Sequence, residues 1–222
     1  MVKICCFHTA KSNVALYDEA ALNLCKLDDA ADYNLEMTHI IRPDLLERIE
    51  QNCDIPNTLA ATADAMRMAA KNADAILLTC SSLGAAVTLA KEQSQNIFFR
   101  SDEELAREAA NLRGKIAAFC SVKTTIKPTQ QIFDAQDFGK ENSFDIILIE
   151  GAWDLFKACQ LQEYNALIAK VANEALKGDY QNIVLVQSSM MKAAKHINHS
   201  TVLTAPEASL KAVMQQFLKL NK

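Results

Sequence analysis

Short apolar runs alternate along this chain with longer segments in which apolar residues recur with the period of a helix. The runs lie near residues 2–7, 35–41, 75–80, 96–99, 115–120, 145–150, 182–187 and 201–204. Their lengths suit buried β-strands, and strands that alternate with helices are typical of βαβ units in a mainly parallel sheet. The pattern therefore predicts an α/β fold.

Two helices are marked by residues at their ends. The clearest covers 57–72, where Asn57 follows Pro56 as a predicted N-cap and the apolar residues return to one face. Pro206 follows the run at 201–204 and predicts a last helix over 206–220. No low-complexity linker or short-period repeat interrupts the order of strands and helices.

A longer repetition is present in the order of the elements. The stretch from about 1 to 95 and the stretch from about 114 to 197 each read strand, helix, strand, helix, strand. We therefore expect two similar α/β lobes that face each other, with a ligand bound in the cleft between them.

Several apolar runs end abruptly in small polar residues. They are followed by His8-Thr9, Cys80-Ser81-Ser82, Ser121, Glu150-Gly151 and Gln187-Ser188-Ser189. In parallel sheets, ligands bind beyond the carboxyl ends of the strands, where loops and helix N-termini present hydrogen-bond donors. These ends predict a ligand site, and the Cys80 thiol is its most reactive group.

Composition narrows the class of protein. The 222 residues suffice for one large domain or for two of about 100–120 residues. The 27 acidic and 23 basic residues leave a net charge of −4, and the basic residues form no stripe, so nucleic acid is not an expected partner.

The apolar runs are too short for a signal peptide or a membrane span, so we expect a cytoplasmic protein without a membrane partner. Seven cysteines without a C-x-x-C pair are typical of reduced thiols in a reducing compartment.

Five motifs at the strand ends resemble those of the aspartate/glutamate racemase superfamily. They are His8-Thr9, Thr79-Cys80-Ser81-Ser82, the loop Ser121–Thr125, Glu150-Gly151-Ala152 and Val186-Gln187-Ser188-Ser189-Met190. The superfamily includes amino-acid and hydantoin racemases, maleate isomerase and arylmalonate decarboxylase, which need no cofactor. The likeness covers nearly the whole chain and is closest to a branch with a similar glutamine-serine motif near its C-terminus.

The resemblance implies two Rossmann-like lobes related by a pseudo-twofold axis, with the active-site cleft between them. The first lobe would hold residues 1–97 and 200–222, and the second would hold 98–199. It also implies a small-molecule carboxylate as substrate, no cofactor, and a possible homodimer, since homodimers are common in the superfamily.

Racemases of this superfamily use two cysteines on opposite faces of the substrate α-carbon. Cys80 matches the first of them, Gln187 stands in the place of the second, and Ser189 stands where a histidine is often found. An amide does not exchange protons as a thiol does, so the resemblance favours a reaction with a single thiol, either decarboxylation or isomerisation. Racemisation of an amino acid or hydantoin with another base is an alternative, and a binding protein for small carboxylates is another.

The predicted site has three groups of residues. Cys80 and His8 are the catalytic candidates: a helix N-terminus would favour the Cys80 thiolate, and the His8 imidazole would accept its proton. Substrate contacts are expected from Thr9, Ser81, Ser82, Ser121, Thr124, Thr125, Gln187, Ser188 and Ser189. Glu150 is expected either to orient the binding residues without touching the substrate or to be only a surface group, and Gly151 is expected to allow a tight turn.

Two plainer interpretations stand beside these, together with two expectations about other residues. The hydroxyls are also suited to cap helices, and His8 to make hydrogen bonds that only hold a strand end. The side chain of Cys120 should point to the opposite face of its strand from Ser121. His39, His196 and His199 show no metal-ligand spacing with a cysteine or carboxylate, so no metal site is expected.

Overall fold

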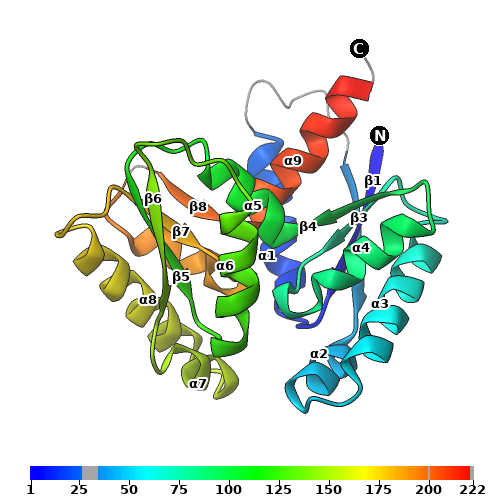
Figure 1. Ribbon diagram of the computed structural model, residues 1–222, viewed down its shortest axis with the longest axis horizontal. Helices are drawn as coiled ribbons and strands as arrows, with labels where there is room; N and C mark the ends of the chain where they lie inside the picture. The colour runs from blue at the N-terminus through cyan, green and yellow to red at the C-terminus, as the bar shows by residue number, and fades with distance from the viewer. Residues whose placement is uncertain (27–34, 200, 221–222) are drawn as a thin grey trace. The chain divides into compact units, whose positions relative to one another are not determined.

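The computed structural model describes residues 1–26, 35–199 and 201–220 of the chain. It has two compact units, one of Met1–Glu104 with Pro206–Lys222 and the other of Leu105–Ala205. Each unit contains a four-stranded parallel sheet flanked by helices (Figure 1). The predicted α/β fold with two similar parallel sheets is confirmed.

All eight predicted runs form strands. The first unit contains β1 (Val2–His8), α1 (Asn13–Leu24), β2 (Leu35–Ile41), α2 (Pro43–Glu50), α3 (Ile55–Ala69), β3 (Ala75–Leu78), the 3₁₀ helix η2 (Ser81–Leu83), α4 (Ala85–Glu92) and β4 (Ile97–Arg100). The helix α5 (Ser101–Ala109) begins in this unit and ends in the next. The last helix of the chain, α9 (Ala205–Leu220), belongs to the first unit apart from its first residue.

The second unit follows the same plan. It contains β5 (Lys115–Cys120), η3 (Lys123–Thr125), α6 (Ile126–Asp134), β6 (Ser143–Leu148), α7 (Ala152–Lys157), α8 (Leu161–Ala175), β7 (Asn182–Leu185), η4 (Ser188–His196) and β8 (Val202–Thr204). Strand order is β2-β1-β3-β4 in the first sheet and β6-β5-β7-β8 in the second. In both sheets the first strand along the chain therefore lies between the second and the third, and the fourth lies at the edge.

One helix start differs from the prediction. The helix α3 begins at Ile55, and its N-cap is Asp54, whose carboxylate accepts the backbone N–H of Asn57 at 3.4 Å. Asn57 is therefore inside the helix and donates its side-chain amide to Asp54 at 2.6 Å. The Asp54 carboxylate is a stronger acceptor than the Asn57 amide, and it lies three residues before the predicted cap. Pro56 is tolerated because the first turn of a helix needs no N–H from it.

The two sides of each sheet are covered by different helices. In the first unit, Cys5 and Phe7 of β1 pack with Ile76 and Leu78 of β3 in a core covered by residues of α2, α3 and α4. In the second, Ala117 and Phe119 of β5 pack against α7, α8 and η4. Because neighbouring residues of a strand point to opposite faces, Cys6, His8 and Cys120 lie on the other sides of these sheets.

The predicted lobe boundaries at 97/98 and 199/200 stay predictions, and residue 200 lies outside the described residues. So do the pseudo-twofold axis and the cleft. Among the described helices, none is both long and apolar enough to cross a membrane.

Candidate functional site

The carboxyl ends of β1 and β3 place Thr9 beside Cys80. Phe7 of β1 is paired with Leu78 of β3, so the residues two positions further along each strand, Thr9 and Cys80, lie next to each other at the same edge of the sheet. The Thr9 hydroxyl is a hydrogen-bond partner of the Cys80 sulfur. Cys80 ends the extended segment and caps the short helix η2, which leads into α4.

The Cys80 thiol is more firmly protonated than the sequence predicts. Burial raises its pKa above the ordinary value, although hydrogen bonds from Thr9 and from the backbone N–H groups of Leu83 and Ser82 lower it. The expected helix N-terminus is present, but desolvation of the thiolate has the larger effect. At neutral pH in the ligand-free protein, Cys80 therefore carries its proton.

His8 does not form the expected pair with Cys80 among the described contacts. Its Nδ1 lies 2.8 Å from the Thr79 hydroxyl, and its Nε2 lies 2.9 Å from Nδ1 of His39. His39 Nε2 in turn lies 3.1 Å from a carboxylate oxygen of Asp18. Burial and the neighbouring His39 lower the pKa of His8 to about 3, so its imidazole is neutral at physiological pH.

A charged pair beside Cys80 was missed in the sequence. Arg100, the last residue of β4, donates from Nε and Nη2 to the two carboxylate oxygens of Asp102 at 3.0 and 2.8 Å. The guanidinium lies against the backbone of Gly84, where an added Cβ would come within 2.0 Å of Nη2. Arg100 is close enough for Cys80 to raise its pKa electrostatically, after the larger effects of burial and Asp102. The signal was available, because Arg100 is another polar residue at a strand end.

The second unit repeats this arrangement with different chemistry. Phe119 of β5 pairs with Leu185 of β7, so Ser121 and Gln187 occupy the positions that Thr9 and Cys80 occupy in the first unit. The side-chain oxygen of Gln187 accepts the backbone N–H of Ser121 at 2.7 Å and its hydroxyl at 3.2 Å. The side-chain amide of Gln187 donates to the Thr125 hydroxyl at 2.6 Å.

Two further side chains extend this hydrogen-bond network. The hydroxyl of Tyr164 donates to Ser121 at 3.1 Å and lies 2.8 Å from the Ser189 hydroxyl. Tyr164 comes from α8 and is buried, and burial raises its pKa. The sequence contains no motif that marks Tyr164, because its role depends on how α8 packs on the sheet.

Cys120 lies on the opposite side of its strand from Ser121, as the sequence predicts. Its sulfur faces the Thr129 hydroxyl of α6 at 3.9 Å, whereas Ser121 contacts Tyr164 of α8. Burial raises the pKa of Cys120, and hydrogen bonds with Thr125, Thr129 and Gln187 lower it. A second thiol therefore lies behind Gln187, fully buried and protonated.

The remaining predicted residues fall into less connected positions. Thr124 and Glu150 are exposed, Ser81 and Ser82 are half-buried in η2, and Ser188 is buried at the start of η4. Gly151 has φ +76°, the left-handed conformation that suits a glycine turn. Thr125 precedes α6 as its N-cap, yet its hydroxyl donates to the Val122 carbonyl at 2.7 Å and does not cap the helix. The plainer interpretation as a cap therefore does not apply to Thr125.

No protein-family model and no curated protein sequence matches this chain. Solved structures do match its fold. The allantoin racemase from Klebsiella pneumoniae superposes with a TM-score of 0.69 at 14% identity, over 100% of this chain and 89% of that one. The Picrophilus torridus aspartate racemase gives 0.70 at 12% identity, over 97% and 94% of the two chains. For the glutamate racemase from Aquifex pyrophilus the values are 0.62 and 13%, over 96% and 83%.

This chain has the fold of the aspartate/glutamate racemase superfamily. The two-sheet α/β fold that the resemblance implied is thus shared with solved structures that have little sequence in common with this chain. Within this racemase fold, Cys80 and Gln187 end equivalent strands of two sheets with the same strand order.

A cluster of metal-ligating side chains also differs from the sequence expectation. Cys6, His8 and His39 each offer one ligand atom, and these atoms lie within 4.8 Å of one another. Sequence spacing did not reveal the cluster because strand pairing creates it: Cys6 of β1 lies opposite His39 of β2.

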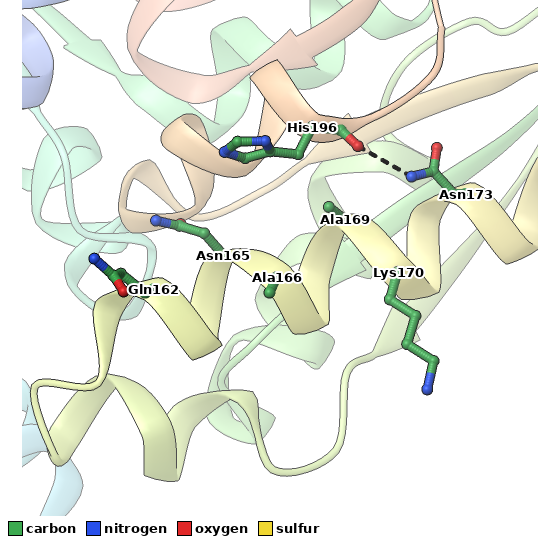
Figure 2. A pocket seen from close by; sticks show the side chains of 7 residues that line it. All are labelled: Gln162, Asn165, Ala166, Ala169, Lys170, Asn173 and His196. Carbon is green, nitrogen blue, oxygen red and sulfur yellow. Dashed lines mark hydrogen bonds between the residues drawn. The ribbon is translucent and has the colours of Figure 1, made fainter.

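The second unit contains a pocket away from the predicted site residues. It has a volume of about 630 Å³ and lies between α8 and the end of η4 (Figure 2). Asn173 donates its side-chain amide to the His196 carbonyl across one side of this pocket at 3.0 Å. Its lining residues are Gln162, Asn165, Ala166, Ala169, Lys170, Asn173 and His196.

Proposed function

We propose that this protein is a cofactor-independent enzyme that acts on a small carboxylate, with the thiol of Cys80 as its proton donor. The observation that carries the proposal is the setting of Cys80: a half-buried thiol at the end of β3, protonated at neutral pH and surrounded by hydrogen-bond donors. A protonated thiol is matched to deliver a proton, and its donors stabilise the thiolate that forms as the proton leaves.

Decarboxylation is the reaction that uses such a thiol most directly. The bond between the α-carbon and the departing carboxylate breaks, carbon dioxide leaves, and the electron pair stays on the α-carbon. The Cys80 proton then forms the new C–H bond, and water reprotonates the thiolate. One proton donor completes this reaction, so the absence of a cysteine at position 187 is no obstacle.

The ion pair near Cys80 supplies no free positive charge, because Arg100 donates two hydrogen bonds to Asp102 and the Asp102 carboxylate raises the pKa of Cys80. Support for an anionic substrate comes instead from the donors at the strand end, the Thr9 hydroxyl and the backbone N–H groups of Ser82 and Leu83, which already face the Cys80 sulfur. Among the structural neighbours, the aspartate and glutamate racemases are named for amino acids that carry two carboxylates.

The alternatives have less support from the geometry. Isomerisation by nucleophilic attack needs a Cys80 thiolate, which burial disfavours. Racemisation needs a second base, and the Gln187 amide is engaged by Ser121 and Thr125 instead. A binding protein would need the hydroxyl and amide groups but not the thiol.

The test uses the full chain in D2O with two groups of compounds. Substituted malonates, which lose carbon dioxide readily, form the first group, and aspartate and glutamate form the second. We expect a malonate to lose carbon dioxide and gain one α-deuterium, as followed by proton NMR. Cys80→Ser should lower the rate by about 10²–10⁴-fold, the usual contribution of an acid–base group, whereas Cys159→Ser, at an exposed cysteine, should not.

Two results would change the assignment. Inversion of an amino acid with α-deuterium uptake, lost in Cys80→Ser, would make the protein a racemase with an unrecognised second base. Stabilisation by carboxylates without turnover of any compound would make it a binding protein.

A further inference from the structure

The first sheet presents a group of ligand atoms on the side that faces away from α2, α3 and α4. Cys6 and His8 lie two positions apart on β1 and so share one face, and Cys6 is paired across the strands with His39 of β2. One ligand atom of each residue lies within 4.8 Å of those of the other two. Cys6 and His8 have no exposed surface.

The contacts of His8 suit either of its two neutral tautomers. The Thr79 hydroxyl lies 2.8 Å from Nδ1 of His8 and 3.2 Å from the Phe7 carbonyl, and that carbonyl also accepts the Thr79 backbone N–H. When the hydroxyl donates to the carbonyl, Nδ1 is the N–H donor and Nε2 presents its lone pair to His39. When the hydroxyl donates to Nδ1, Nε2 carries the proton and donates it to His39.

His39 is oriented by Asp18. A carboxylate accepts hydrogen bonds only, so the contact of 3.1 Å between Asp18 and Nε2 of His39 assigns the N–H to that nitrogen. In the neutral imidazole, Nδ1 of His39 therefore carries a lone pair. The two nitrogens face each other at 2.9 Å.

In the tautomer of His8 with its proton on Nδ1, two nitrogen lone pairs face each other here, with the Cys6 sulfur close to both, and such a group suits a shared cation. We propose that Cys6, His8 and His39 form a binding site for a divalent transition-metal ion of the zinc type. One thiolate and two imidazoles are ligands that zinc and copper prefer over magnesium or calcium. The outer hydrogen bonds to Thr79 and Asp18 are the kind that orient histidines at metal centres.

The geometry needs only a small adjustment to hold the ion. Zinc bonds of about 2.0–2.3 Å in a tetrahedral arrangement place ligand atoms roughly 3.3–3.7 Å apart, compared with the present limit of 4.8 Å. An ion can enter beside His39 and Asp18, whose side chains are 15% and 48% exposed. The three protein ligands leave a fourth position for water or another small ligand.

The site is independent of the proposed reaction, since no step there passes through a metal. Its consequence is structural: the ion would join β1 to β2 at the carboxyl end of β1. That end leads into Thr9, the hydrogen-bond partner of Cys80. Metal loading would thus tie down one side of the candidate site.

Metal binding by the untagged full chain is the test. After chelator treatment, Zn²⁺ is titrated in competition with a chromophoric chelator, and Co²⁺ is titrated for its absorption spectrum. We expect one tightly bound ion per chain, a rise in melting temperature with Zn²⁺, and for Co²⁺ the near-ultraviolet charge-transfer band of a cobalt–thiolate bond. Asp18→Asn should weaken binding by about 10–100-fold, as expected for loss of an outer partner.

Matched variants distinguish this site from other thiols and imidazoles. Cys6→Ala should remove the thiolate band, and His39→Gln should weaken binding by more than about 100-fold. Cys5→Ala, at the neighbouring residue but on the opposite face, and His196→Gln, at an exposed histidine, should leave binding unchanged. His39 is partly exposed, so His39→Gln remains informative if Cys6→Ala fails to fold.

The proposal is overturned if the chain binds no ion tightly, which would mean that only a hydrogen bond joins the two histidines. It is also overturned if Cys6→Ala and His39→Gln bind as the unaltered chain does. Neither result would bear on decarboxylation by Cys80, which is assayed separately in metal-free buffer.

Discussion

Replacing Gln187 by leucine tests whether this residue holds the ends of β5 and β7 together. The side chain has similar size in both residues, but leucine has no hydrogen-bonding atoms. The substitution removes the acceptor of the Ser121 backbone N–H at 2.7 Å and of the Ser121 hydroxyl at 3.2 Å, and it removes the donor to Thr125 at 2.6 Å.

The expected cost comes mainly from the backbone N–H. Ser121 is only 2% exposed, so its N–H would be left without a partner and with little access to water. An unsatisfied buried donor costs about 1–3 kcal/mol. The two hydroxyls keep other partners, Tyr164 for Ser121 and the Val122 carbonyl for Thr125, so their losses are smaller. We expect Gln187→Leu to lower the free energy of unfolding of the second unit by about 2–4 kcal/mol.

Hydrogen exchange of the Ser121 amide gives the most direct measurement. A loss of about 1–3 kcal/mol at this N–H corresponds to roughly 5- to 150-fold faster exchange. Gln187→Glu keeps an oxygen for Ser121 and should retain most of the protection. Gln130→Leu is the control: among the described residues Gln130 donates to Asp134 in an exposed hydrogen bond on α6, and its replacement should change stability by less than about 0.5 kcal/mol.

The reasoning is wrong if Gln187→Leu leaves both the exchange of the Ser121 amide and the unfolding free energy as they were. That result would mean that the side chain is free to leave the network at little cost. Gln187 would then be available to a ligand, not committed to the strand ends.

Three further predictions concern Cys80, Gly84 and Thr124, the last of which is expected to contact a carboxylate substrate. Alkylation of Cys80 by iodoacetamide, followed by mass spectrometry, should begin at higher pH than that of free cysteine in solution, because burial raises the Cys80 pKa and delays thiolate formation. An earlier onset would contradict the burial argument. Gly84→Ala should displace Arg100 and lower stability by about 1–3 kcal/mol. Gly178→Ala is the control, because an added Cβ there meets only ordinary contacts. Equal melting temperatures of the two variants would refute the clash at Gly84. Malonate should raise the melting temperature more than sodium chloride of equal ionic strength does. Thr124→Val should reduce that rise without altering the melting temperature of the ligand-free protein, because Thr124 is exposed. An unchanged rise would mean that Thr124 does not contact the anion.

The neighbouring positions of polar residues at the strand ends were predictable, because such residues are a local signal. The pairs Thr9 with Cys80 and Ser121 with Gln187 both follow from strands of the expected lengths in a parallel sheet. The pKa of Cys80 was not predictable, since the helix N-terminus is visible in the sequence but the extent of desolvation is not. The N-cap of α3 was predicted three residues too late because two side chains able to cap it, Asp54 and Asn57, lie close together in the sequence. The local sequence did not decide which of them caps the helix.

By itself, the sequence determined the order and type of the elements and the residues at their ends, since both depend on short-range periodicity and on single positions. Only the tertiary structure decided which side chains meet. His8 and Thr79 are 71 positions apart, and Tyr164 reaches Ser121 from 43 positions away. Hydrogen bonds act over about 3 Å, so strand pairing and helix packing had to bring these groups together. The same pairing placed Cys6 opposite His39, a contact that no spacing along the chain records.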